Sequence, residues 1–458
     1  MEVLSIEEIV SATHGRLMNS GRISAVSGVS IDSRKINQGD MFIALQGESF
    51  DGHDFIYKAI ENGAALAVTH KQLSGCSIPY ILVEDTLKAL QDIARYYRNK
   101  FQIPFVAITG SSGKTTTKDM IASVLSQKFK VLKTEGNFNN AIGLPLTLLK
   151  LKPSHEIAVL EMGMSSLGEI RLLSDIVRQD VGVISNVGTA HIEKLGSRKN
   201  ILKAKLEIFS YFYSASTAVI NGDNDMLADF DSKEYKVFRY GLGKSNDIYA
   251  YGIKEKGEDG IDFRVDMEGV SEVFTVILPG IHNVYNALSA IAVARLFGME
   301  AGEIRKGLIS FKPSKMRMDI INLSRGVKLI NDVYNANPES MKAAIDVLQG
   351  LKSGGRSICI LGDMLELGDF SAKEHYKIGT YAASSGVDVL IAAGSFSGDM
   401  KRGALASGMN CTNIYAFPTA EEVIASLEGI IKPGDSVLLK GSRRMKMECI
   451  VDYLRERG

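Results

Sequence analysis

Apolar and polar positions alternate along the chain in a way that predicts strands followed by amphipathic helices. Apolar runs of about five residues are typical of strands, and apolar positions recurring every three to four residues are typical of helices. In residues 1–100 this pattern predicts helices at 4–10, 54–62 and 86–98, and strands at 28–32, 41–45, 65–69 and 80–83. A small N-terminal α/β domain is therefore expected, with a boundary near Pro104 because proline resists continuing a helix.

Residues 101–311 contain more strongly apolar segments, as expected for strands that are buried on both faces. Helical stretches separate most of these segments, which fall at 105–108, 157–160, 181–184 and 218–220. Residues 260–278 alternate instead, which predicts antiparallel strands, and a helix is expected at 283–297. We expect a central domain with a mostly parallel sheet covered by helices.

Residues 312–458 begin the alternation again after Pro313, which suits a linker. Strands separated by helical patterns are predicted at 328–331, 358–361, 387–391 and 436–439. This repetition predicts a C-terminal doubly wound, Rossmann-like domain. The expected fold is thus α/β with three domains, at 1–100, 101–311 and 312–458.

Composition and charge narrow the classes of function. The 458 residues carry 53 Lys and Arg against 53 Asp and Glu, so no overall field attracts nucleic acid or an anionic membrane. The four cysteines are far apart and form no C-x-x-C pair, so neither a zinc site nor a disulfide framework is indicated. The N-terminus lacks a basic segment followed by an apolar one, and no apolar run approaches about 20 residues. A cytoplasmic protein without a signal peptide or membrane span is expected.

The strongest chemical signal lies between the strand at 105–108 and the helical pattern that follows it. Gly110 and Gly113 allow a tight loop whose N–H groups can point at phosphate oxygens, and the helix N-terminus adds positive charge. Lys114 can reach the outer phosphates and Thr115 can hold Mg²⁺. A surface turn that caps an ordinary helix is the alternative, but the flanking strand and helix favour a nucleotide site. Its predicted residues are Thr109, Gly110, Ser111, Ser112, Gly113, Lys114, Thr115 and Thr116.

Two further polar residues follow predicted strands of the same sheet. Glu161 comes directly after the strand at 157–160, and His191 lies in the polar segment after the strand at 181–184. Ligands of open α/β sheets bind at the carboxyl ends of strands, where a carboxylate can ligate Mg²⁺. Glu161 could instead cap the next turn, and His191 could be an ordinary loop residue. Beside Lys114 and Thr115, we favour metal-binding roles for both.

The compact T-G-x-x-G-K-T-T loop and the motifs after it resemble the Mur ligase family, ATP-driven enzymes that build the peptide of bacterial cell-wall precursors. The resemblance covers nearly the whole chain, and the motifs fall in the family's order. It implies that Lys205, in the stretch 203–209, is carbamylated and acts as a carboxylate toward a second Mg²⁺ ion. Without the resemblance, a lysine on an amphipathic helix is normally a solvated charge.

The resemblance also implies how ATP is held. Asn283, in a string similar to the family's H-N-x-x-N motif, would bond the adenine. Arg317 resembles the linker arginine that approaches the ATP phosphates, and Asp332 resembles the aspartate that binds the ribose. Each of the three could otherwise have an ordinary surface role.

Two strings, at 332–340 and 361–368, resemble those of the family member that adds D-alanyl-D-alanine to a UDP-N-acetylmuramoyl-tripeptide. A sister ligase has D-Y-A-H-x-P where this chain has D-V-Y-N-A-N-P. The loop departs from the resemblance, with Ser111-Ser112 in place of T-N. The similarity of the N-terminal domain implies that Ser33 and Arg34 bind the uridine nucleotide. That of the central domain implies that its muramoyl-peptide meets Thr134, Asn137 and Asn140.

Asn335 and Asn337 follow a strand of the third domain, where their amides could position a neutral dipeptide. Alternatively, both could cap the helix that Pro338 opens. We favour the substrate role.

The expected activity is ATP-dependent ligation through an acyl phosphate, which completes the pentapeptide precursor of peptidoglycan. The expected ligands are ATP, two Mg²⁺ ions, the UDP-N-acetylmuramoyl-tripeptide and D-alanyl-D-alanine, with no nucleic acid and with a monomeric chain. The third domain would close over the second around a hinge at 311–315 and exclude water. The alternatives are a related ligase that adds a single amino acid or glutamate, a P-loop ATPase or switch protein, and a non-catalytic nucleotide-binding module.

Overall fold

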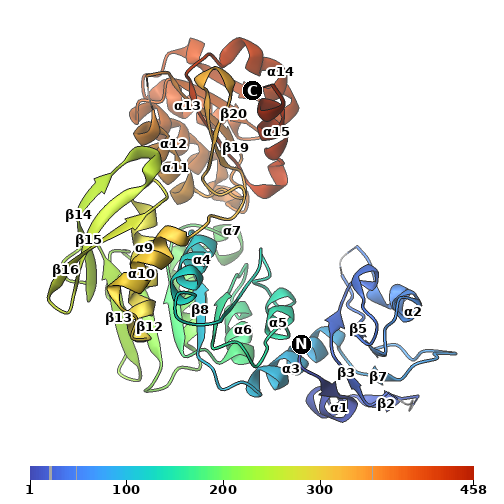
Figure 1. Cartoon of the computed structure of the whole chain (residues 1–458). Helices are drawn as coiled ribbons and strands as arrows, with labels where there is room; N and C mark the ends of the chain where they lie inside the picture. The colour runs from blue at the N-terminus through green and yellow to red at the C-terminus, as the bar shows by residue number, and fades with distance from the viewer. Residues whose placement is uncertain (20–22, 48, 353, 458) are drawn as a thin grey trace.

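The computed structural model describes residues 1–19, 23–47, 49–352 and 354–457. Three lobes follow one another along the chain, and the central lobe lies between the other two (Figure 1). Each lobe has its own main sheet, of five, nine and six strands in turn. No helix in these ranges is both long enough and apolar enough to cross a membrane.

The first lobe is a mostly parallel sheet in the order β2-β7-β6-β5-β4, with β2 antiparallel to β7. Its elements are β1 (Leu4–Ser5), α1 (Ile6–Thr13), β2 (Arg16–Met18), β3 (Ala25–Val26), β4 (Val29–Ser30), β5 (Met41–Ile43), α2 (Ile56–Glu61), β6 (Leu66–Thr69), β7 (Tyr80–Leu82) and α3 (Thr86–Asn99). The helix expected at 4–10 begins at Ile6, because Ser5 and Glu8 form a capping box that fixes its first turn.

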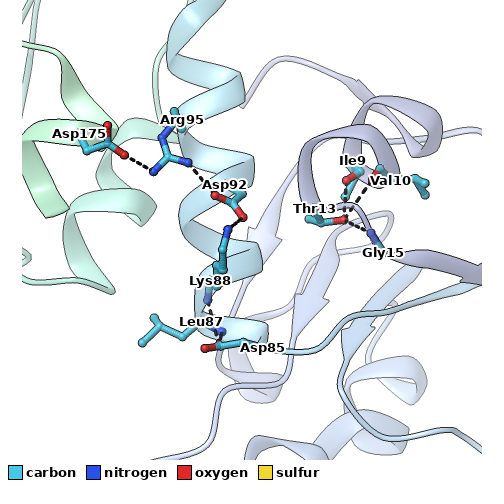
Figure 2. Close-up of polar contacts among 10 residues, drawn as sticks. All are labelled: Ile9, Val10, Thr13, Gly15, Asp85, Leu87, Lys88, Asp92, Arg95 and Asp175. Carbon is cyan, nitrogen blue, oxygen red and sulfur yellow. Dashed lines mark hydrogen bonds and ion pairs between the residues drawn. The ribbon is translucent and has the colours of Figure 1, made fainter.

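Helix α3 joins the first lobe to the central lobe. Its N-terminus is capped by Asp85, and further along it Arg95 donates to Asp92 and, 2.6 Å away, to Asp175 of the central lobe (Figure 2). Two residues further along, the Tyr97 hydroxyl donates to the Leu151 carbonyl at 2.7 Å. The helix therefore belongs to the packing of both lobes.

The central sheet has the order β16-β15-β14-β13-β12-β11-β8-β10-β9. Its strands are β8 (Phe105–Thr109), β9 (Val131–Lys133), β10 (Ile157–Glu161), β11 (Val181–Ile184), β12 (Thr217–Asn221), β13 (Lys236–Gly241), β14 (Ile248–Glu255), β15 (Ile261–Met267) and β16 (Val270–Val276). Neighbouring strands from β9 to β14 in this order are parallel, and β8 lies between β10 and β11. Strand β15 is antiparallel to both of its neighbours, β14 and β16. The antiparallel strands expected at 260–278 are confirmed, whereas β9, β13 and β14 were not predicted.

Helices cover the central sheet, and the side chains of 105–108 are fully buried between them. These helices are α4 (Lys114–Leu125), α5 (Gly143–Leu148), α6 (Glu169–Val177), α7 (Ile192–Leu195), α8 (Arg198–Leu206), α9 (His282–Leu296) and α10 (Ala301–Ser310). A strand buried on both faces must be apolar throughout, which explains why 105–108 has no polar position.

The C-terminal sheet has the order β17-β18-β22-β19-β20-β21 and is parallel except for β17. Its strands are β17 (Asp319–Asn322), β18 (Lys328–Asp332), β19 (Ser357–Gly362), β20 (Val389–Ala393), β21 (Ile414–Phe417) and β22 (Ser436–Lys440). The helices are α11 (Pro338–Leu351), α12 (Ser371–Ser384), α13 (Ser397–Ala406), α14 (Ala420–Ile430) and α15 (Glu448–Arg457). The expected doubly wound architecture is therefore present in this lobe.

Candidate active site

A cleft of about 600 Å³ lies where carboxyl ends of strands from the central and C-terminal sheets face each other. Ligands of open α/β sheets bind at the carboxyl ends of strands. This cleft lies at such ends of both sheets. Predicted site residues from both lobes line it: Ser111, Ser112, Gly113, Lys114, Thr115, Thr116, Asn137, Asn140, Glu161, His191, Asn283, Arg317, Asp332, Asn335 and Asn337.

The phosphate loop joins β8 to α4, and glycine is required at two of its positions. Gly113 has a φ of 76° at the N-cap of α4, and a Cβ on Gly110 would lie 1.9 Å from the Ser185 hydroxyl. The first hydrogen bond of α4 runs from the Thr117 N–H to the Gly113 carbonyl at 2.8 Å. The preceding N–H groups of the first turn therefore have no partner within the helix, as an anion site requires.

Asn186, which the sequence analysis did not single out, shapes this loop. Its Oδ1 accepts from the N–H groups of Ser111 and Ser112 at 3.0 and 2.9 Å, and its Nδ2 donates to the Ser112 hydroxyl. These two loop N–H groups brace the loop and are not directed at a ligand. The expected phosphate donors are thus the N–H groups of the first turn of α4. Lys114 Nζ folds back to the Gly110 carbonyl at 2.8 Å.

Glu161 ends β10 with an incompletely satisfied carboxylate. Its Oε1 accepts from Asn139 at 2.7 Å, but its Oε2 is buried without a hydrogen-bond partner and lies 4.0 Å from Lys118 Nζ. The side chain is only 2% exposed. An unpartnered carboxylate oxygen inside a protein is costly, and a bound cation would relieve that cost.

His191 lies at the start of α7 and faces the C-terminal lobe. Its Nδ1 is 2.5 Å from Glu366 Oε2, although the two atoms are not aligned as a hydrogen bond. Both residues have a φ of 64°, a left-handed conformation that is strained for side chains of this size. The contact with His191 is the main cause that lowers the pKa of Glu366. A carboxylate of one lobe thus meets an imidazole of the other at the edge of the cleft.

Lys205 is on α8, and its side chain is buried beside the cleft. The residue is 1% exposed, and its ammonium has no hydrogen bond or ion pair in the ranges that the structure describes. Burial first, and the charge of Lys114 second, hold the pKa of Lys205 well below its usual value. The same ranges contain no group of three or more His, Cys, Asp and Glu side chains that could hold a metal.

At the other end of the cleft, Asp332 ends β18 and accepts from Lys440, which ends the neighbouring strand β22. Lys440 is buried, and it was not predicted as a site residue because it directly follows the apolar strand expected at 436–439. The Arg317 guanidinium stacks 4.0 Å above the Tyr334 ring. Asn283 is buried and donates to the Pro279 carbonyl at 2.8 Å. These interactions orient the three side chains that were predicted to bind the nucleotide.

The first turn of α11 spans from the C-terminal lobe to the phosphate loop. Asn337 caps α11 by accepting from the Ser340 N–H at 2.9 Å, and its Nδ2 donates to the Ser111 carbonyl at 3.4 Å. The Glu339 carboxylate accepts from the Thr189 N–H and hydroxyl, both at 3.1 Å. The capping role weighed for both asparagines is thus present at Asn337. Asn335 is exposed, and its side chain accepts from the next N–H, that of Ala336.

Other predicted residues lie outside this cleft. Ser33 and Arg34 are on the first lobe, where Arg34 forms a two-pronged ion pair with Asp32. Thr134 is fully buried, and its hydroxyl accepts from the Glu161 N–H at 2.9 Å. Thr109 is buried at the end of β8 behind the loop. Thr134 therefore supports Glu161 from behind and has no free surface in this conformation.

Comparison with known proteins matches all three lobes to one family. Residues 25–98 match "Mur ligase family, catalytic domain", residues 108–294 match "Mur ligase middle domain", and residues 316–443 match "Mur ligase, glutamate ligase domain". The UDP-N-acetylmuramoyl-tripeptide–D-alanyl-D-alanine ligase of Bacillus subtilis is 38% identical over 99% of this chain and 98% of its own.

Solved structures agree with this match. The chain superposes on a crystal structure of MurF from Acinetobacter baumannii with a TM-score of 0.92 at 33% identity, over 100% of this chain and 99% of the other. MurF ligase from Thermotoga maritima, solved in complex with ADP, gives a TM-score of 0.80 at 28% identity over 94% and 97% of the two chains. The likeness thus includes the arrangement of all three lobes.

Proposed function

Because the chain belongs to the Mur ligase family, we propose that it is an ATP-dependent ligase that joins D-alanyl-D-alanine to a UDP-N-acetylmuramoyl-tripeptide. The observation that carries the proposal is full-length similarity to ligases named for this reaction, at 38% identity in one case. The product would be the pentapeptide precursor of peptidoglycan, made in the cytoplasm, where ATP is available. We propose a monomer without a nucleic-acid partner.

The reaction needs an activated carboxylate, because a free carboxylate and an amine do not condense in water. ATP would transfer its γ-phosphoryl group to the carboxylate of the tripeptide, giving an acyl phosphate and ADP. The dipeptide amine would then attack the acyl carbon, lose its proton and release inorganic phosphate. Lys114 and the first turn of α4 suit this chemistry because they offer positive charge to the transferring phosphoryl group.

The residues around Glu161 fit a magnesium site. Thr115 supplies a hydroxyl, His191 an imidazole, and Glu161 a buried oxygen that accepts no hydrogen bond. Bound Mg²⁺ would neutralise charge on the phosphates and the reacting carboxylate. We propose two ions, with the second near His191 and Lys205.

We further propose that Lys205 is carbamylated. A neutral amine attacks carbon dioxide and loses a proton, which leaves a carbamate, and the lowered pKa of Lys205 makes the neutral amine available. The modification would place a negative group on a buried side chain whose amine makes no hydrogen bond or ion pair with the residues that the structure describes. It would also supply the additional anionic ligand that the unmodified residues lack.

The three domains, at 1–100, 101–311 and 312–458, would divide the ligands among them. Ser33 and Arg34 are proposed contacts of the uridine nucleotide, whereas Thr134, Asn137 and Asn140 belong to the segment proposed to meet the muramoyl-peptide. Asn283, Arg317 and Asp332 would hold ATP. Asn335, which is exposed in the cleft, is the better candidate of the two asparagines for the dipeptide.

The deciding experiment measures ADP release by purified protein with the tripeptide nucleotide, with D-alanyl-D-alanine, and with both. Release that requires both substrates supports the proposal, and mass spectrometry should then find the pentapeptide nucleotide. Release driven by a single amino acid would indicate a sister activity, and release without an amine would indicate an ATPase. Lys114→Ala should lose the activity and keep its melting temperature, which excludes a contaminating enzyme.

A further inference from the structure

The linker between α10 and β17 carries Arg317 into the cleft in a strained conformation. Met316 and Met318, on either side of Arg317, have φ values of 61° and 52°. Residues other than glycine rarely adopt this conformation, and they keep it only when their surroundings hold it in place. The position of Arg317 therefore depends on contacts that hold the linker on both sides.

The C-terminal lobe supplies one set of these contacts. The Met316 carbonyl accepts from the Tyr334 N–H, and the Met318 N–H donates to Asp332, both at 3.3 Å. The Arg317 guanidinium rests on the Tyr334 ring. These contacts move with the C-terminal lobe, so they do not fix Arg317 relative to the phosphate loop.

A contact to the central lobe comes from Ser314. Its hydroxyl donates to Asp119 Oδ2 at 2.8 Å, across 195 residues of sequence. Asp119 is on α4, the helix that begins with the phosphate-binding Lys114. The Asp119–Ser314 contact thus ties the linker to the same rigid helix that carries Lys114.

Asp119 is a buried carboxylate that is held firmly in place. Its Oδ1 lies 2.8 Å from Lys133 Nζ and 3.3 Å from Lys118 Nζ. Burial raises the pKa of Asp119, but the two lysines and the Ser314 hydroxyl outweigh it and leave the pKa below its usual value. Ser314 therefore donates to an ionised acceptor, which makes this a strong type of hydrogen bond.

We propose that Asp119 is a positioning residue that, through Ser314, holds the linker so that Arg317 reaches ATP at a fixed distance from Lys114. This inference rests on the proposed use of ATP. It gives a role to Asp119 and Ser314, for which no contact with a substrate was predicted. A bland alternative is that Asp119 serves only as the counterion of Lys118. The two roles differ in what loss of the Ser314 hydroxyl does, because that hydroxyl does not contact Lys118.

The test compares Ser314→Ala with two controls in the full-length protein. Ser314→Thr keeps the hydroxyl. Ser310→Ala removes a nearby hydroxyl, before the linker begins, that donates to Gly307 within α10 and accepts from Gln127, just beyond the end of α4. The main readout is calorimetric binding of a non-hydrolysable ATP analogue with Mg²⁺. Ser314→Ala should raise its Kd about tenfold, and both controls should stay within about twofold of wild type.

Steady-state kinetics then separate positioning from general damage. Ser314→Ala should raise KM for ATP by a similar factor and leave KM for D-alanyl-D-alanine unchanged. Asp119→Asn should also weaken analogue binding, but it leaves Lys118 short of a partner and should lower Tm as well. Ser314→Ala carries the decision because its fold should be intact.

Wild-type affinity for the analogue in Ser314→Ala would overturn the inference, whatever Asp119→Asn does. So would an equal loss in Ser314→Ala and Ser310→Ala accompanied by a lower Tm, because that result indicates packing of the linker. Failure of the proposed function is distinguishable: wild-type protein would then bind the analogue normally and show no dipeptide-dependent release of ADP.

Discussion

Two lysines of the central lobe, Lys118 on α4 and Lys205 on α8, are buried to the same extent and have opposite surroundings. Each residue is 1% exposed. Lys118 Nζ donates to the Thr134 carbonyl at 2.8 Å and lies 3.3 Å from Asp119 and 4.0 Å from Glu161. Lys205 has no such partner in the part of the chain that the structure describes, and its nearest charged influence is the cation Lys114. Equal burial therefore does not mean an equal role.

The difference shows how a fold prepares a side chain for chemistry. Removing a buried ammonium that has partners destabilises the native state, because its partners are then left buried without a compensating charge. A buried amine without partners costs stability and is retained only if it does something else. The contrast leads to four expected results.

Lys118→Met should be the most destabilising of these changes, because it leaves Asp119 and the buried oxygen of Glu161 short of positive charge. We expect a loss of about 3–5 kcal/mol in the free energy of unfolding. Urea denaturation measures it, with Lys205→Met as the matched variant. If both variants lose the same free energy, the partners of Lys118 contribute nothing and the comparison fails.

Lys205→Ala should strongly slow ligation without loss of stability. The expected fall in kcat is roughly 100-fold or more, because a ligand of the proposed magnesium site is removed. Small carboxylic acids should restore part of the rate by occupying the vacated position. Rescue by these acids in Lys205→Ala and not in Lys114→Ala would separate the carbamate role from simple damage, whereas absence of rescue together with an unmodified intact mass would contradict it.

Stability should depend on pH through Lys205. Its pKa is lowered in the folded state, so below the unfolded value of about 10.4 the unfolded chain binds more protons, and the native state loses stability as pH falls. Lys205→Met removes this cost. In buffer free of carbon dioxide, its advantage over wild type should grow from pH 10 toward pH 7, at up to about 1.4 kcal/mol per pH unit. A constant difference across that range would show that the folded amine is not perturbed.

Lys133→Ala should have the smallest effect of the four. Lys133 also pairs with Asp119, but its side chain is 47% exposed, so water and salt screen the interaction. We expect a loss below about 1 kcal/mol in the free energy of unfolding, decreasing at high salt. A loss as large as that of Lys118→Met would mean that exposure is a poor guide to the role of lysines around Asp119.

Part of this site follows from local patterns in the sequence, and part does not. Lys114, Glu161 and His191 each follow an apolar strand, and the rule that ligands bind at strand ends brought them together. Asn186, Lys440 and Asp119 escaped notice because the contacts that give them their roles join residues 75, 108 and 195 positions apart in the chain. Such contacts leave no periodic signal, since they depend on how separate elements pack.

Burial was equally hard to foresee for polar residues. The spacing around Lys205 suits a solvated lysine, and only the family resemblance pointed to a special role. Thr134 was expected to lie in the segment that meets the substrate and is instead enclosed behind Glu161. In the fold, β13 and β14 were missed because Lys236–Gly241 and Ile248–Glu255 mix charged with apolar positions near the edge of the parallel region. The short strands β9 and β21 were also missed, whereas the fully buried strands β8, β10, β11 and β20 were predicted with ends that differ by up to two residues.

Helix α3 has a consequence for any attempt to cut this protein into pieces. Because Arg95 Nη2 and the Tyr97 hydroxyl donate to the central lobe, a fragment ending near residue 100 would carry the helix without these two acceptors. Limited proteolysis should therefore spare this connection, and the first stable fragments should retain α3 together with the sheet that contains β8. A fusion or split-protein junction between 86 and 104 should therefore be poorly tolerated, even though Pro104 suggested a domain boundary there.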